Sequence, residues 1–269
     1  GHVEAVGYHG NERPVALVGL AEKAPNEYVL YKEGAGGHAS KPGNGTVLGD
    51  VARAIAAVEA HPMPYRLTPL VKAHLKALAE SVADKKVAKL YAHPKKHWDD
   101  IMKLAKHDRE LDAKLHTTFA VTMAEASAQA NVLPSHAEAT MSVRILQGDT
   151  VASVKHYLES IMPCDVQVKA TFAEDPKPAG SVESEAYHLM SETIYDIFGK
   201  ETLIVPNLML GASDSRNYAK VSDNVFRFSG RLKTEQWGEA HQVDERMPIE
   251  HLGVPVQFFK AFLKKYSEK

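Results

Sequence analysis

Several segments of the chain carry the apolar pattern of β-strands. An unbroken apolar run at residues 14–20 predicts a strand buried on both faces, with Glu22 at its carboxyl end. Residues 138–146 place apolar side chains at every second position, which predicts a half-buried strand. Further strands are expected at residues 28–32, 117–126, 166–172, 202–205 and 225–228.

Other segments repeat apolar residues with the period of an α-helix. Residues 46–59 predict one amphipathic helix, and Thr150 is placed to cap another that runs to about Met162. The lysine-rich region 68–116 predicts two or three amphipathic helices, with a break near Pro94. Two more helices are expected at residues 185–198 and 248–267.

The order of these elements indicates the fold class. Residues 117–172 follow the order strand, strand, helix, strand, which is typical of a compact open-faced α+β unit. The elements on either side predict an α/β arrangement, a mixed sheet flanked by helices. A proline-rich stretch at residues 175–180 is the best candidate for a boundary between domains.

Composition and charge narrow the classes of function. The chain has 269 residues, enough for two domains or one large one, and its formal net charge of −2 provides no global field that would favour nucleic acid or an anionic membrane. No apolar run approaches the roughly 18 residues of a membrane span, and no signal peptide opens the chain. The single cysteine, Cys164, excludes an internal disulfide and a cysteine-based metal site. This usage suits a reducing cytoplasm, where we expect the protein to reside.

Two histidines stand in polar segments rather than on apolar stripes. His38 lies in the glycine-rich segment 34–40, which can present the imidazole to a ligand, form a backbone nest for an anion, or serve as a flexible hinge. His241 precedes Glu245 in an acidic loop, where a neutral imidazole suits Zn²⁺. The simpler alternative for His241 is a surface histidine without a ligand.

Carboxylate, guanidinium and backbone groups complete the candidate chemistry. Glu22 can ligate a metal at the end of its strand, or reach solvent as an ordinary strand-end charge. Arg144 lies on the polar face of a strand and is grouped with Asn131, because its fork suits a carboxylate; the alternative is an ordinary exposed arginine. The loop with Gly211 and Ser213 can offer N–H groups to a substrate, or form a capped turn before a helix.

The order of these segments is more specific than any one of them. It resembles the aminoacylase/carboxypeptidase-S group of dinuclear zinc hydrolases, metallopeptidase family twenty, over almost the whole chain. The similarity is weakest from about residue 68 to 116. The segments that carry the resemblance are Ala21-Glu22-Lys23, Gly36-Gly37-His38-Ala39-Ser40, Asn131-Val132-Leu133-Pro134, Val143 to Thr150, Gly211-Ala212-Ser213-Asp214-Ser215-Arg216, and His241 with Glu245.

This resemblance implies an α/β catalytic domain, here partial, interrupted by a smaller α+β lid or dimerisation domain. On that basis residues 1–32 and 175–269 are expected to belong to the catalytic domain, and residues 33–174 to the lid. The helices at about residues 65–116 look like an insertion carried by the lid. The resemblance also implies a homodimer that forms through the lid.

The same resemblance implies metal and catalytic roles. Glu22 and His241 resemble ligands of the two zinc ions, with cobalt or manganese as possible replacements. His38 resembles the lid histidine that stabilises the oxyanion, often in the site of the partner subunit. Glu245 matches a family position but is given no role as a direct ligand.

Substrate contacts are implied at four further positions. Asn131 and Arg144 resemble lid residues that hold the substrate carboxylate. Gly211 and Ser213 lie in a loop that resembles a contact to the substrate backbone. The expected substrates are therefore dipeptides or N-acyl amino acids with a free carboxylate.

The sequence departs from the family pattern in one respect. The family's His-x-Asp pair, bridging Asp and Glu-Glu pair lie upstream of the segment that matches residues 14–22; this chain has no Glu-Glu, and its His97-Trp98-Asp99 stands in a helical context. The chain is thus expected to be the C-terminal part of a zinc-dependent amide hydrolase, inactive alone and active as the full-length protein. The alternative is a non-enzymatic dimerisation or binding module that keeps the fold.

Overall fold

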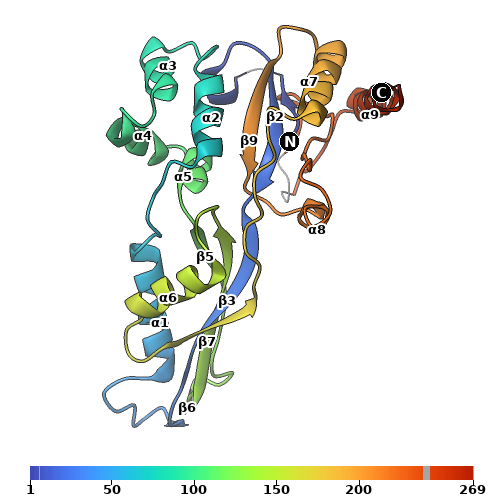
Figure 1. Ribbon diagram of the computed structural model, residues 1–269. Helices are drawn as coiled ribbons and strands as arrows, with labels where there is room; N and C mark the ends of the chain where they lie inside the picture. The colour runs from blue at the N-terminus through green and yellow to red at the C-terminus, as the bar shows by residue number, and fades with distance from the viewer. Residues whose placement is uncertain (6, 239–242, 269) are drawn as a thin grey trace.

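Two β-sheets lie end to end along an elongated molecule (Figure 1). The computed structural model describes residues 1–5, 7–238 and 243–268. The first sheet has the strand order β10-β1-β2-β9, in which β2 (Val15–Glu22) and β9 (Leu203–Met209) pair in parallel. Its other strands are short: β1 (Val3–Glu4) and β10 (Leu232–Lys233). Every residue of β2 is buried, as its unbroken apolar run predicts.

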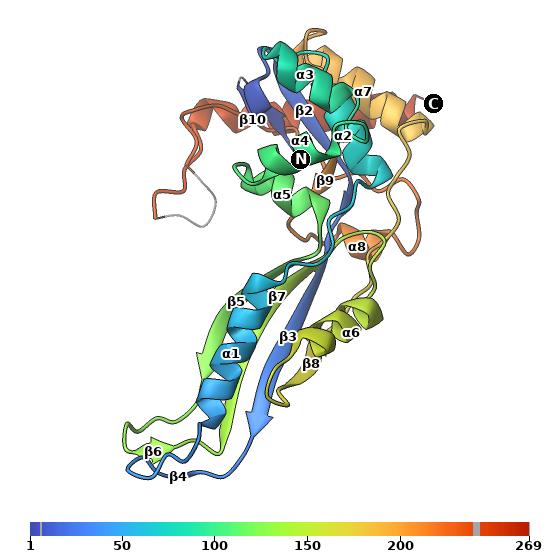
Figure 2. The same cartoon turned by 90° about the vertical axis from the view of Figure 1, so that its left-hand side faces the viewer.

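The second sheet is antiparallel, with the order β5-β7-β3-β8. Strand β3 (Ala24–Glu33) follows β2 after the single residue Lys23, so one extended segment runs through both sheets (Figures 1 and 2). The other strands are β5 (Thr118–Glu125), β7 (His136–Ile145) and β8 (Gln167–Phe172). Buried and half-buried positions alternate along β7, which confirms the alternation predicted from the sequence.

One face of the second sheet is covered by α1 (Val47–Ala60) and α6 (Val151–Ile161). Each helix begins at a threonine whose hydroxyl accepts a backbone N–H of the first turn, Thr46 in α1 and Thr150 in α6. Thr150 also forms a capping box with Ser153, so the predicted helix start is confirmed.

Helices cover both faces of the first sheet. On one face lie the four short helices α2 (Pro69–Leu78), α3 (Lys85–Ala92), α4 (Trp98–Ala105) and α5 (Arg109–Leu115). On the other face lie α7 (Glu185–Phe198) and α9 (Gly253–Ser267). The short helix α8 (Ser215–Tyr218) follows β9, and single 3₁₀ turns occur at Tyr8–Gly10 and Ile249–His251. The mixed α/β architecture expected from the sequence is confirmed.

The helical region 65–116 packs differently from the sequence expectation, which assigned it to the lid. Leu75 and Leu78 of α2 share a buried core with Leu17 of β2 and Val205 of β9, all in the first sheet. The chain therefore leaves the second sheet after α1, covers the first sheet, and returns through α5 to β5 (Figure 2). The apolar periodicity identifies the buried face of each helix but not the surface that buries it.

Three smaller predictions were wrong in detail. The region 68–116 forms four helices rather than two or three. Residues 225–228 form no strand; a single bridge joins Gly19 to Arg227 instead. The last helix begins at Gly253 rather than near residue 248. Within the described residues, no helix combines the length and the apolar character needed to cross a bilayer.

A buried polar network fastens α2 and α5 to the first sheet. The ring of His74, 2% exposed, lies with Nδ1 3.1 Å from the carbonyl oxygen of Pro206 and Nε2 3.2 Å from Nζ of Lys114. Lys114 also donates to Glu110 Oε1 at 2.6 Å and to the Tyr8 hydroxyl at 3.1 Å. Burial, and then the Lys114 charge, lower the pKa of His74 well below its ordinary value. His74 is therefore neutral in the folded protein at pH 7.

Because His74 is neutral in the folded protein, we expect the free energy of unfolding to fall at low pH. Unfolded His74 takes up a proton near pH 6.5, whereas the folded chain does not, so stability falls as the pH drops below 6.5, by about 1.4 kcal/mol per pH unit. Urea unfolding at pH 7.5 and 5.5 measures the loss. A His74→Gln variant should flatten this dependence, and the exposed-site control His107→Gln should keep it. Equal slopes in the parent chain and His74→Gln would contradict the assignment.

Candidate functional site

Glu22 ends β2 at the junction of the two sheets. Its side chain is buried, with 5% of the residue exposed, so it does not extend into solvent as a strand-end charge. The strand β9 ends beside it, since Glu22 pairs with Met209 in the parallel ladder. Both carboxyl ends thus lie at one edge of the sheet, the edge where α/β proteins bind ligands.

Three donors from two serines surround one oxygen of this carboxylate. Oε2 of Glu22 accepts the backbone N–H of Ser213 at 3.1 Å and the Ser213 hydroxyl at 2.7 Å. The Ser215 hydroxyl lies 3.3 Å from the same oxygen. On the backbone side, Gln147 Nε2 donates to the carbonyl oxygen of Glu22 at 2.9 Å. The residues around Glu22 hold it in one orientation.

Arg227 is the charge partner of Glu22, and it was not among the residues predicted from the sequence. Its Nε lies 3.5 Å from Glu22 Oε2, and the residue is 7% exposed. The guanidinium also donates to the carbonyl oxygens of Val225 at 2.9 Å and Leu20 at 3.3 Å. Burial lowers the pKa of Arg227, while the Glu22 carboxylate opposes that shift. The sequence does contain a sign of this pair: an arginine within the apolar residues 225–228 is expected to be buried and therefore to need a buried partner.

The second carboxylate oxygen of Glu22 has a different environment. Oε1 is buried and makes no hydrogen bond within the described part of the chain. A buried, unpaired carboxylate oxygen is the donor that a metal such as Zn²⁺ binds, so this residue fits the predicted ligand role. The described residues contain no cluster of three or more histidine, cysteine, aspartate or glutamate side chains that could hold a metal. Glu22 alone would therefore supply one ligand of a larger set.

His38 and Asn131 lie together at the far end of the second sheet. Strand β4 (Gly37–His38) pairs with β6 (Val132–Leu133) in a two-stranded ribbon, and Ala39 N–H donates to the Asn131 carbonyl oxygen at 3.0 Å. The Ser40 N–H donates to His38 Nδ1 at 3.2 Å. Because Nδ1 accepts, the neutral ring of His38 carries its proton on Nε2. The imidazole is exposed and presents an N–H donor.

Arg144 lies at the opposite end of that sheet. It pairs with Pro25 of β3, two residues beyond Lys23, and its Nη1 is buried without a hydrogen-bond partner among the described residues. From His136, at the ribbon end of β7, to Arg144 the strand spans about 27 Å at 3.3–3.4 Å per residue. The structure therefore does not bring Arg144 and Asn131 together within one chain. It places Arg144 at the start of β3, close in the chain to Glu22, and leaves His38 with Asn131 on the ribbon of β4 and β6.

The loop after β9 carries the other two predicted contacts. Gly211 is exposed, and a Cβ added there would meet no atom within 4 Å. The backbone at Gly211 is therefore open to a ligand. Ser213, by contrast, is half-buried and directed to Glu22.

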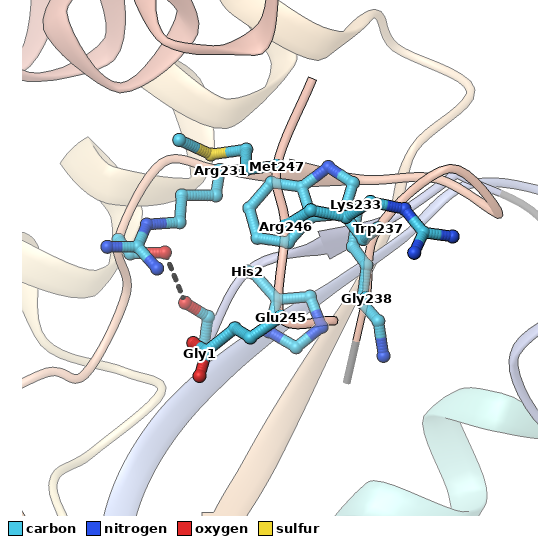
Figure 3. Close-up of a pocket in the computed structure, with 10 residues that line it drawn as sticks. Gly1, His2, Arg231, Lys233, Trp237, Gly238, Glu245, Arg246 and Met247 are labelled. Carbon is cyan, nitrogen blue, oxygen red and sulfur yellow. Dashed lines mark hydrogen bonds between the residues drawn. The ribbon is translucent and has the colours of Figure 1, made fainter. Parts of the chain in front are cut away.

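A cavity of about 630 Å³ opens beside the first sheet (Figure 3). Arg231, Lys233 and Arg246 make its lining basic, and Trp237 forms part of its wall. Of the described residues with a predicted metal, catalytic or substrate role, none lines this cavity; Glu245, which was given no role as a direct ligand, does. The predicted ligand His241 lies outside the described residues, in the segment between the lining residues Gly238 and Glu245.

Comparison with known proteins places this geometry in a family. Residues 27–163, just over half of the chain, match the model of the peptidase dimerisation domain of the M20 group. The N-fatty-acyl-amino acid synthase/hydrolase PM20D1 of Mus musculus is 27% identical over 94% of this chain and 51% of its own length. The probable carboxypeptidase S-like 2 of Dictyostelium discoideum is 27% identical over 96% of this chain and 50% of its own length. The chain thus spans about half the length of these curated relatives.

Solved structures share the fold at low sequence identity. The M20 family metallo-carboxypeptidase Sso-CP2 from Sulfolobus solfataricus superposes with a TM-score of 0.64 at 15% identity, over 95% of this chain and 61% of that one. Human carnosine dipeptidase 1 superposes with a TM-score of 0.60 at 12% identity, over 97% of this chain and 58% of that one.

Proposed function

Since this chain belongs to the M20 peptidase family, we propose that the full-length protein hydrolyses the amide bond of a dipeptide or an N-acyl amino acid with a free carboxylate. Relatives that match over more than nine-tenths of the chain are named as an N-fatty-acyl-amino acid synthase/hydrolase and as a probable carboxypeptidase S-like protein. The observation that carries the proposal is the Glu22 carboxylate, with Oε2 held by donors and Oε1 buried without a hydrogen-bond partner in the described part of the chain. The cytoplasmic location expected from the sequence stays a prediction.

The proposed cofactor is zinc, with cobalt or manganese as replacements. Glu22 would hold the metal through its unpaired oxygen, and His241 is the second proposed ligand. When bound, zinc supplies polarisation of the amide carbonyl and activation of water. The remaining ligands are proposed to lie in a part of the full-length protein that corresponds to the half of each relative this chain does not match.

His38 is proposed to stabilise the oxyanion of the reacting amide. Its Nε2–H is exposed, and Ser40 fixes the tautomer from the other side of the ring. An N–H donor in fixed orientation stabilises the negative charge that develops on the carbonyl oxygen. Asn131, beside it on the ribbon, is proposed to contact the same substrate.

The distance between the two groups of residues supports a site shared by two subunits. His38 and Asn131 are separated from Glu22 and Arg144 by the length of the second sheet. In a homodimer formed through the second sheet and its helices, the ribbon of one subunit can reach the sheet edge of its partner. Arg144 is then proposed to bind the substrate carboxylate, because its Nη1 lacks a partner among the described residues.

A non-enzymatic dimerisation module is the alternative function. It is favoured by one observation, that the described residues hold no complete set of metal ligands. The two functions predict opposite results for metal binding by the full-length protein.

Metal removal tests the proposed function. The full-length protein should lose hydrolysis of N-acyl amino acids and dipeptides after dialysis against a chelator and regain it with Zn²⁺ or Co²⁺. Glu22→Gln should lower both the bound zinc and the rate, by at least about 100-fold for the rate. The exposed control Glu12→Gln should leave both unchanged. A metal-free protein, or hydrolysis that survives the chelator, would reject the proposal.

A further inference from the structure

The predicted substrate contact Ser213 lies against the Glu22 carboxylate. Building on the proposed metal role of Glu22, we infer that Ser213 is a positioning residue for the Glu22 carboxylate and makes no hydrogen bond to the substrate. Its side chain and its backbone both donate to one oxygen of that carboxylate, Glu22 Oε2.

The inference rests on the hydrogen-bond donors of Ser213, which are both used by Glu22. A serine has two donors, its backbone N–H and its hydroxyl. The N–H lies 3.1 Å and the hydroxyl 2.7 Å from Glu22 Oε2, so neither remains for a second acceptor. The Ser213 oxygen still accepts, and the Ser215 hydroxyl lies against it. A substrate carbonyl or carboxylate would therefore find no donor at Ser213.

The course of the chain brings Ser213 to this position. Strand β9 runs parallel to β2 and pairs its Met209 with Glu22, while the N–H of Lys23 donates to the Met209 carbonyl oxygen at 2.9 Å. This bond fixes the start of the loop beside the carboxylate. Helix α8 begins at Ser215 and fixes the other end of the loop. Ser213 is thus held over Glu22 by backbone on both sides.

Ser213 and Arg227 act on the same oxygen in different ways. Arg227 provides the charge that compensates the buried carboxylate, with Nε 3.5 Å from Oε2. Ser213 provides two shorter neutral contacts that set the direction of the carboxylate without adding positive charge next to a metal. Together they leave Oε1 as the carboxylate oxygen of Glu22 that has no hydrogen-bond partner among the described residues. Without the Ser213 hydroxyl, the carboxylate can turn toward Arg227 and Oε1 loses its fixed position.

The prediction is tested with Ser213→Ala in the full-length protein. Loss of a group that orients a ligand lowers metal affinity by about 10- to 100-fold. We expect Co²⁺ to bind about 10-fold more weakly, with an altered visible spectrum, while KM at saturating metal stays unchanged. Ser213→Thr, which keeps the hydroxyl, should restore both readouts. The matched control Ser215→Ala removes a hydroxyl that lies farther from Oε2, at 3.3 Å, and should change affinity less than about 2-fold.

Two results separate this inference from the proposed function. A raised KM with unchanged Co²⁺ affinity in Ser213→Ala would make Ser213 a substrate contact and overturn the inference. If the parent protein binds no Co²⁺, the proposed metal role fails, and the amide resonance of residue 213 decides the positioning claim alone. That resonance should move upfield in Glu22→Gln of the metal-free chain, because the carboxylate acceptor is lost. An unmoved resonance would overturn the inference.

Discussion

Replacing Arg227 with Met is expected to lower the free energy of unfolding by about 3 to 5 kcal/mol. The substitution leaves the Glu22 carboxylate buried without a charge partner, and it removes donors from the carbonyl oxygens of Val225 and Leu20. Both residues of the pair are less than a tenth exposed, so water cannot replace the lost guanidinium. Urea unfolding followed by circular dichroism at pH 7 measures the change.

A second substitution and a control separate this effect from a general loss of packing. In the double variant with Glu22→Gln and Arg227→Met the buried charge is gone, and we expect more than half of the lost stability to return. The control Arg231→Met removes the same charge from an exposed residue and should change stability by less than about 0.5 kcal/mol. If the double variant is less stable than Arg227→Met alone, charge compensation is not the role of Arg227.

Mixing two inactive variants of the full-length protein is expected to restore activity. His38→Ala and Glu22→Gln should each lower the rate by at least about 100-fold. If every site combines His38 of one subunit with Glu22 of the other, a mixed dimer contains one intact site. Random exchange makes half of the dimers mixed, so the mixture should recover about one quarter of the parent rate. Rates measured after subunit exchange at a range of mixing ratios test this value.

The control for this experiment pairs two variants of the same ribbon. His38 and Asn131 lie side by side on β4 and the segment before β6, so a dimer of His38→Ala with Asn131→Ala has a defective ribbon at both sites. The hydrolysis rate of that mixture should not exceed the residual rates of its two variants. No recovery in the first mixture would mean that the site forms within one subunit. Recovery in the control mixture would mean that His38 and Asn131 of one chain serve different sites.

The local elements could be predicted because short-range pattern determines them. The unbroken apolar run of β2 and the alternation of β7 gave strands that are buried as expected. Thr150 begins its helix because a hydroxyl at that position satisfies a free N–H of the first turn. In contrast, Val225–Phe228 has the apolar pattern of a strand but forms only one bridge, since a strand also needs a partner with free backbone groups.

Pairings between distant segments could not be predicted from these patterns. The sequence placed Glu22 at the end of a buried strand and Arg227 in an apolar run, yet nothing local joins residues so far apart in the chain. It grouped Asn131 with Arg144 as side chains suited to hold a substrate carboxylate, whereas β7 separates them by its length. Contacts of this kind depend on strand register and on which surfaces pack together.

The family, the mixed α/β architecture and most of the strands and helices follow from the amino-acid sequence alone, because periodicity, caps and motif order can be recognised along the chain. Three features become visible only in the folded chain: α2–α5 cover the first sheet, Arg227 and Ser213 hold Glu22, and His38 lies a sheet's length from Glu22. A hydrophobic face or a buried charge requires a partner, but the residues next to it in sequence do not identify that partner, because folding brings it from a distant segment.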